Sequence, residues 1–268
     1  MNKQATITTN IYEKNKVIPN GIEMERHKSI TTPKGLVIST MSIICKLGVN
    51  ININSINTNM KLSHDDIILI KLNNSIRAID NALIKKKKKT KHEKKSFYNQ
   101  ITTIINVNNI NKVNVKLFIN GSIQMTGCKS IDDSYIVLDK LIKRLKEEDF
   151  VSDNKIIKIS DYKITLINSD YKIKFNINRD ILYKLLKEEN IDSSFKPNIH
   201  AGVIIKYPIT ELDIINKTST LIFESGKIII TGAKNEYQIK TTYNYINSFL
   251  RKYKSEIIKK NIDYTLFL

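Results

Sequence analysis

The stretch STLIFESGKIIITGAK, Ser219–Lys234, is the most regularly patterned part of this 268-residue chain. Two apolar, β-branched runs flank Glu-Ser-Gly, a pattern typical of a β-hairpin. Because successive strand side chains point to opposite faces, we expect two apolar faces. One would carry Ile222, Ile228 and Ile230, and the other Leu221, Phe223, Ile229 and Thr231.

A degraded copy of this stretch occurs earlier in the chain as NVKLFINGSIQMTGCK, Asn114–Lys129. A single offset, 223 − 118 = 105 residues, relates the two without a gap. It pairs Phe118 with Phe223, Gly121 with Gly226 and Thr126 with Thr231. The repetition predicts that the chain consists of two copies of one α+β unit.

The order of predicted elements supports the same division. In the first half we expect a strand at 35–48, a helix at 65–83, strands over 96–129 and a helix from 131. Strands at 162–177, a helix at 179–189, strands at 200–207 and 220–231, and a helix at 236–253 follow. The expected organisation is a flexible tail 1–34, a first repeat 35–150 with a basic inserted loop at 85–95, a second repeat 151–256 and a C-terminal tail 257–268.

Composition indicates a packed protein with an anionic partner. The hydrophobic content is 41%, which is enough for a core, and 44 basic against 26 acidic residues give a net charge of +18. Such an excess favours a polyanion as partner, although a chain rich in Lys, Ile and Asn reflects an AT-rich genome in part. The basic run at 85–95 is a solvated loop, a DNA-contacting arm or a nuclear-import signal.

Several classes of function are excluded. Cys45 and Cys128 have no cysteine or histidine at metal-ligand spacing, so we expect no disulfide, no metal ion and a reducing compartment. The chain contains no P-loop, no GxGxxG and no nucleophile–base pattern, which argues against an enzyme or a cofactor. No uncharged apolar run approaches the roughly 20 residues that cross a bilayer.

The helices are too few to cover both faces of the predicted sheet. About two helices per repeat cover one face, which leaves the other apolar face for a partner. Packing against the other repeat or a second subunit is the alternative. The turns and strand ends around this face carry lysines that suit the phosphate walls of a DNA minor groove. They are Lys129, Lys206, Lys227 and Lys234.

The two hairpins carry a family resemblance. LIFESGKIIITGAK and LFINGSIQMTGCKSIDDS resemble the second- and first-repeat signatures of the TATA-box-binding protein family, and the resemblance extends from about residue 36 to 253. It is typical of divergent members from large DNA viruses or protists. It implies a saddle with a concave antiparallel sheet, helices on the convex face, and a transcription initiation factor that binds A/T-rich promoter DNA in the minor groove.

The resemblance also implies wedge residues that bend the duplex. The family inserts two pairs of phenylalanines into DNA, one pair per repeat. Phe118 and Phe223 match one member of each pair. The partner positions align with Ile101 and His200, and Phe97 is the alternative to Ile101.

Other family positions that approach DNA are only partly retained. The paired threonines match Thr126 and Thr231, and the apolar floor matches Leu221 and Ile229 in the second repeat. Lys116 and Gln124 hold the floor positions of the first repeat. Two base-reading asparagines align with Thr40 and Leu166, and two valines with Ser42 and Asn168. Strict TATA specificity is therefore in doubt, and the second half is expected to provide most of the apolar contact.

The resemblance implies partners as well as DNA. These are a factor of the transcription factor IIB type, further initiation factors and RNA polymerase. The loop FKPNIHAG, Phe195–Gly202, has Lys196 and Asn198 where the family is acidic, so the factor IIB contact is altered or lost. The implied location is the nucleus or, for a viral protein, the cytoplasmic factory or virion. The alternative function is a saddle-shaped protein-interaction module with only non-specific DNA binding.

Overall fold

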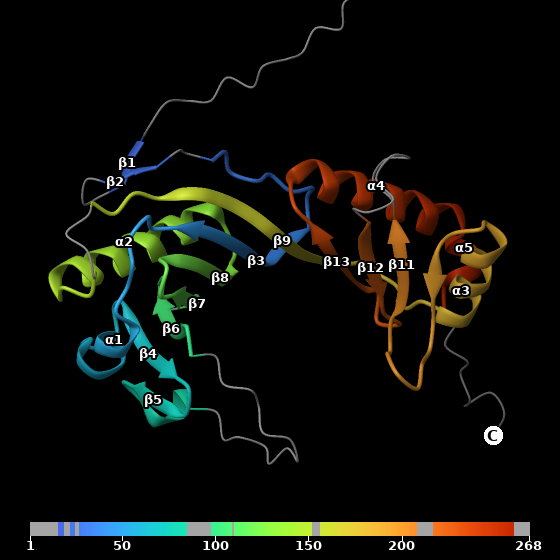
Figure 1. The fold of residues 1–268 in the computed structure, drawn as a ribbon. Helices are drawn as coiled ribbons and strands as arrows, with labels where there is room; N and C mark the ends of the chain where they lie inside the picture. The colour runs from blue at the N-terminus through green and yellow to red at the C-terminus, as the bar shows by residue number, and fades with distance from the viewer. Residues whose placement is uncertain are drawn as a thin grey trace, which may run out of the picture.

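The computed structural model describes residues 16–18, 22–24, 27–84, 98–108, 110–151, 156–207 and 217–259. The basic segment 85–95, Phe97, and residues 1–15 and 260–268 of the predicted tails lie outside these ranges. Within them the chain forms an arched sheet with helices along one side (Figure 1).

The main sheet is entirely antiparallel. Its eleven described strands follow the order β10-β11-β12-β13-β9-β3-β8-β7-β6-β4-β5. The strands of the first half are β3 (Val37–Lys46), β4 (Ile67–Leu72), β5 (Ser75–Ala78), β6 (Gln100–Asn106), β7 (Lys112–Phe118) and β8 (Ser122–Cys128). Those of the second are β9 (Ser160–Lys172), β10 (Ser193–Ser194), β11 (Val203–Tyr207), β12 (Thr218–Ile222) and β13 (Lys227–Ala233). A separate pair, β1 (Lys16–Ile18) and β2 (Ile22–Met24), precedes them.

In the described part of the chain, the helices cover one sheet face and leave the other bare. Helices α2 (Ile131–Glu147) and α4 (Glu236–Lys252) run along the convex side of the arch (Figure 1). Helix α1 (Ile53–Asn59) lies at one outer end, and α3 (Arg179–Glu188) and α5 (Lys254–Ile257) lie at the other. The predicted α+β saddle, with a concave antiparallel sheet and helices on its back, is confirmed.

A pseudo-twofold axis passes between β3 and β9, the two central strands. Val37 pairs with Asp170 and Ile44 pairs with Lys163. Adding 126 to the β3 residue of one pair gives the β9 residue of the other, since 37 + 126 = 163 and 44 + 126 = 170. Two isolated bridges join Ile51 to Val151 and Ile177 to Ile258. Their first residues, Ile51 and Ile177, obey the same relation, because 51 + 126 = 177. The two halves are therefore copies of one unit.

Helix α2 begins at a capping box. The Ser130 hydroxyl accepts a hydrogen bond from the Asp133 amide at 3.0 Å and donates one to the Asp133 carboxylate at 3.0 Å. The helix then buries Val137, Leu141 and Leu145 against the sheet. Each buried side chain of this size stabilises the fold by roughly 1.5–3 kcal/mol, so burial of this face holds the helix in place.

The predicted helix at 65–83 is wrong. This segment forms the hairpin of β4 and β5 and a 3₁₀ turn, Asn81–Leu83. Asn73 has φ 53°, which suits a tight hairpin turn, and β4 pairs with β6 on its other side. Tertiary strand pairing overrides the helical spacing of the apolar residues. Helix α1 was not predicted from the sequence, because it is short and buries only Ile53 and Ile56.

Part of the expected N-terminal tail is packed against the body. The His27 ring stacks on Tyr162 with 4.4 Å between centroids. The Thr31 amide donates to Glu236 at 2.8 Å. Residues 27–34 thus connect the start of β9 with the start of α4. At the other end, Ile257 is fully buried, so the packing of the second half continues beyond residue 256.

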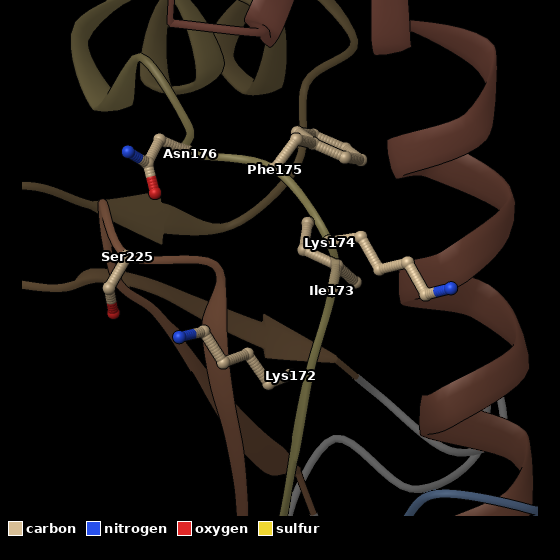
Figure 2. Close-up of a pocket in the computed structure, with 6 residues that line it drawn as sticks. All are labelled: Lys172, Ile173, Lys174, Phe175, Asn176 and Ser225. Atoms are coloured by element: carbon tan, nitrogen blue, oxygen red, sulfur yellow. The ribbon is translucent and has the colours of Figure 1, made fainter.

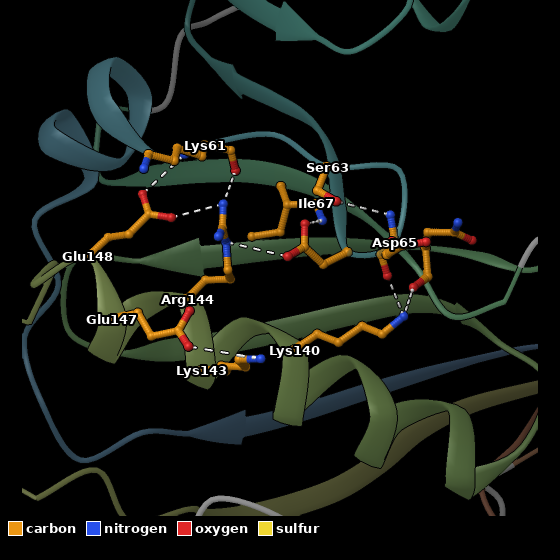
Figure 3. Close-up of polar contacts among 11 residues, drawn as sticks. Lys61, Ser63, Asp65, Ile67, Lys140, Lys143, Arg144, Glu147 and Glu148 are labelled. Atoms are coloured by element: carbon orange, nitrogen blue, oxygen red, sulfur yellow. Dashed lines mark hydrogen bonds and ion pairs between the residues drawn. The ribbon is translucent and has the colours of Figure 1, made fainter.

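Polar contacts fix α2 to the first-half strands (Figure 3). Arg144 forms ion pairs with Glu148 at 2.9 Å and with Asp66 at 3.4 Å. The Lys140 ammonium group donates to the backbone carbonyls of Asp65 at 2.6 Å and Asn106 at 2.7 Å. The helix is therefore joined both to the segment before β4 and to the end of β6.

In the second half, the loop after β9 is bonded to the turn between β12 and β13. The Ile173 amide donates to the Gly226 carbonyl at 3.0 Å, and the Ile177 amide donates to the Glu224 carbonyl at 2.8 Å. Gly226 has φ +76°, and a Cβ there would lie 2.6 Å from the Phe175 carbonyl oxygen. Glycine is therefore required both for its backbone conformation and for this close approach.

Replacing Gly226 by alanine should destabilise the protein more than the same change at Gly35. Both glycines have positive φ, but a Cβ at Gly35 (φ +86°) meets nothing within 4 Å. The left-handed backbone costs each variant about 1–2 kcal/mol. The overpacking at Gly226 costs about 1–3 kcal/mol more. Urea unfolding measures both losses, and equal losses would show that the loop and turn are not closely packed.

Candidate nucleic-acid interface

The concave face consists of the side chains that alternate with the buried core residues. On β12 and β13, Ile222, Ile228 and Ile230 are fully buried toward the helices, as predicted. Their neighbours are half-buried and lie on the opposite face. The concave residues of the second half are Ile204, Lys206, Ser219, Leu221, Phe223, Ile229 and Thr231. Those of the first half include Thr102, Asn114, Lys116, Phe118, Gln124 and Thr126.

The two halves of the concave face differ in polarity. In the second half, strand register aligns Ile204, Leu221 and Ile229 in a row across three strands. The corresponding row of the first half contains Thr102, Lys116 and Gln124. One half therefore presents an apolar floor and the other a polar one, although the backbone is the same.

Phe223 and His200 lie together at the outer end of the second half. Their ring centroids are 5.9 Å apart, with the rings tilted by 49°. The Gly202 amide donates to the His200 Nδ1 atom at 3.0 Å. A Cβ at Gly202 would lie 3.2 Å from His200 and 3.3 Å from Phe223. Glycine at this position therefore leaves room for the two rings to meet.

The assignment of Ile101 to the DNA-facing surface is wrong. Ile101 is fully buried, because strand alternation directs it toward the helices. It pairs with Leu117, as Val203 pairs with Ile222 in the second half. Ile101 thus corresponds to Val203, with an offset of 203 − 101 = 102.

Tyr98 occupies the position that corresponds to His200. The same offset gives 200 − 102 = 98, and the Tyr98 side chain is 79% exposed. In both halves a ring, Tyr98 or His200, lies three residues before the first buried strand residue. This spacing is the sequence signal that could have identified Tyr98. Phe97, the alternative, lies outside the described ranges.

The centre of the concave face is polar. Thr40 pairs with Asn168, and Ser42 pairs with Leu166, around the pseudo-twofold axis. The Thr231 hydroxyl donates to the Asn168 side-chain oxygen at 2.5 Å. In the first half, the Thr126 and Ser42 hydroxyls lie 3.5 Å apart.

The predicted lysines fall into two groups. Lys206 is exposed on β11, on the same face as Leu221, and Lys227 is exposed and lies 3.5 Å from Asp170. Lys129 and Lys234 follow β8 and β13 in the loops to α2 and α4, where their amides donate to Asp133 and Gln238. Lys129 and Lys234 therefore lie at the ends of β8 and β13 that are farthest from the hairpin turns.

None of three further features, a metal site, a membrane-spanning helix and a reactive thiol, is found in the described parts of the chain. No three His, Cys, Asp or Glu side chains there could hold a metal ion together. None of the helices found there is long and apolar enough to cross a membrane. Burial raises the pKa of the Cys45 and Cys128 thiols to about 12, so neither is a reactive nucleophile.

The comparisons with known proteins agree with this geometry. The family described as "Transcription factor TFIID (or TATA-binding protein, TBP)" matches residues 161–253. A TATA-box-binding protein-like protein of Acanthamoeba polyphaga mimivirus is 35% identical over 256 residues, which covers 86% of this chain and 69% of the relative. The chain belongs to the TATA-box-binding protein family.

Other relatives support the same assignment. The TATA-box-binding protein of Picrophilus torridus is 30% identical over 142 residues, covering 53% of this chain and 70% of the relative. The solved Methanococcus jannaschii TBP shares the fold with a TM-score of 0.55 at 18% identity, over 81% of this chain and 98% of that one. The family is one of non-enzymatic DNA-binding factors, which confirms the expectation that the chain is not an enzyme.

Truncating Ile101 should destabilise the protein far more than truncating Tyr98. Ile101→Ala leaves a cavity in the core and should lower the free energy of unfolding by about 2–5 kcal/mol. Tyr98→Ala removes an exposed side chain and should change it by less than about 0.5 kcal/mol. Chemical denaturation of the two variants measures both values. A small loss for Ile101→Ala with a large one for Tyr98→Ala would reverse the placement of these residues.

Proposed function

We propose that the protein binds A/T-rich promoter DNA in the minor groove with its concave face and acts in transcription initiation. It bends the duplex by inserting Phe118 and Phe223 between base steps. The observation that carries this proposal is the bare concave face, with an aromatic ring at each end and threonines near the centre. His200 lies beside Phe223, and Tyr98 holds the equivalent position in the first half, so these two side chains are the proposed partners in insertion.

Insertion of the rings alone does not supply the free energy that bending costs, so other contacts with DNA must contribute. Unstacking a base step costs a few kcal/mol, and burial of one phenylalanine returns roughly 1.5–3 kcal/mol. The rings therefore offset only part of the cost of bending. The apolar floor at Leu221 and Ile229 and the release of counterions by a chain of charge +18 supply the remainder.

The hydrogen-bond pattern at the centre supports a preference for A/T pairs. The minor groove of an A·T pair offers only acceptors, whereas guanine adds an amino donor. Because Asn168 accepts from Thr231 through its side-chain oxygen, its amide NH₂ group is left as the donor for base acceptors. A guanine amino group would meet the apolar Leu221 and Ile229, which cannot accept its hydrogen bond. Selection is therefore stricter in the second half.

The proposal includes recruitment of a factor of the transcription factor IIB type and of RNA polymerase. The loop 195–202 begins at Phe195, whose ring lies 5.3 Å from the Arg179 guanidinium. Lys196 is exposed on this loop, so a partner that binds here would present acidic side chains. The site of action is the nucleus or, as the mimivirus relative suggests, a viral factory or virion.

Phe223→Ala should abolish the bend at one end of an A/T-rich duplex. Loss of the inserted ring should weaken binding roughly 10- to 100-fold, the equivalent of burying one phenylalanine. Fluorescence energy transfer between dyes at the two duplex ends measures bending and affinity together.

The matched control is Tyr237→Ala, which removes a 62% exposed ring from α4 and should change neither quantity. If Phe223→Ala binds and bends DNA like the wild type, the ring is not inserted and the proposed mechanism fails.

A further inference from the structure

A hollow of about 480 Å³ lies at the outer end of the second half, beside the turn that follows Phe223. It is lined by residues 172–176 and Ser225. In Figure 2 the side chains of Lys172, Asn176 and Ser225 extend to the same side, whereas Lys174 and Phe175 extend toward the helices. We call Lys172, Asn176 and Ser225 the Lys172 cluster.

The Lys172 cluster occupies a fixed place relative to Phe223. Its loop is bonded to the turn through the Ile173–Gly226 and Ile177–Glu224 hydrogen bonds. Glu224 in turn accepts from Arg179 at 3.0 Å and from Lys259 at 2.6 Å. Ser225 is only two residues from Phe223, so any group that the cluster binds lies next to the proposed wedge.

The cluster also shares the concave face. Tyr171 is buried toward the helices, so strand alternation places Lys172 and Asp170 on the opposite face. Lys172 pairs with Lys227 across β9 and β13. Lys172 is exposed, and among the described residues its side chain has no ion-pair or hydrogen-bond partner. The side chains of Asn176 and Ser225 likewise make no hydrogen bond within the described ranges.

In the first half, the lysine at the equivalent position is neutralised by an acidic side chain. The residue equivalent to Lys172 is Lys46, since 172 − 126 = 46, and it forms an ion pair with Asp161 at 2.9 Å. The equivalent of Asp161 beside Lys172 is Gly35, since 35 + 126 = 161. With glycine in place of the acid, Lys172 has no ion-pair partner among the described residues.

The residues around Lys172 are also more basic than those around the equivalent position in the first half. Lys227 of the second half corresponds to Ser122 of the first, because 227 − 105 = 122. The hollow beside Phe118 measures about 410 Å³ and is lined by uncharged residues. Among the described residues, the lysine at the first-half end, Lys46, is therefore ion-paired, whereas Lys172 at the second-half end is not.

We propose that the Lys172 cluster binds a backbone phosphate of the duplex beyond the step entered by Phe223. An ammonium group, a hydroxyl and an amide are the side-chain donors that commonly bind phosphate oxygens in protein–DNA contacts. The contact extends the bound length of DNA at the second-half end. This inference rests on the proposed function.

The test compares Lys172→Ala with Lys46→Ala, since both variants lose one positive charge. Affinity is measured against salt concentration for an A/T-rich duplex with long flanks and for one truncated at the wedge steps. On the long duplex, Lys172→Ala should reduce the slope of log K against log salt by about 0.9, the value for one phosphate. On the truncated duplex the slope should equal that of the wild type. Lys46→Ala should leave both slopes unchanged, and Lys172→Arg should restore the wild-type slope.

The outcomes distinguish this inference from the function on which it rests. If the wild type bends A/T-rich DNA selectively but Lys172→Ala keeps the wild-type slope on the long duplex, the phosphate contact is wrong and the proposed function stands. Equal reductions for Lys172→Ala and Lys46→Ala would also overturn the contact, because they would reflect net charge alone. A wild type without A/T-selective binding would overturn both.

Discussion

The antiparallel pairing of β3 with β9 is the constraint on which the rest of the structure depends. It joins two similar units into one continuous sheet, so that α2 and α4 both cover the same side. The register shifts at related places, between Ile38 and Thr40 and between Ser42 and Ile43. Such irregularities bend and twist a strand locally, which is consistent with the arch. A bare concave face follows from this pairing.

The two halves share a backbone but differ in surface chemistry. The core positions remain apolar in both copies, because loss of a buried side chain costs several kcal/mol. The concave positions carry no such constraint, and there Leu221 of one copy corresponds to Lys116 of the other. The ion pair of Lys46 with Asp161 has likewise been lost around Lys172. A symmetric scaffold therefore presents an asymmetric surface to a nearly symmetric ligand.

The predictable parts of this fold are those with regular spacing. The alternation of the Ser219–Lys234 hairpin and the long apolar faces of α2, α3 and α4 suffice to place the two layers and the concave residues. The β4–β5 hairpin was mistaken for a helix because its apolar residues also fit a helical period. Ile101 was misplaced because the offset between the halves is 105 at the two hairpins but 102 at β6 and β11, a change that falls in the connections from β6 to β7 and from β11 to β12. The packing of residues 27–34 depends on single contacts, such as His27 with Tyr162, which leave no periodic signal.

The central claim is that the concave face recognises A/T-rich DNA by shape and apolar contact as well as by charge. The most direct measurement is a salt series of binding to A/T-rich and G/C-rich duplexes of equal length. Phosphate contacts weaken steeply with salt, whereas apolar contacts do not. The account predicts that preference for the A/T-rich duplex persists as salt rises. Equal binding to both duplexes that disappears at moderate salt would contradict it and would indicate a protein-interaction module whose DNA affinity is only residual charge.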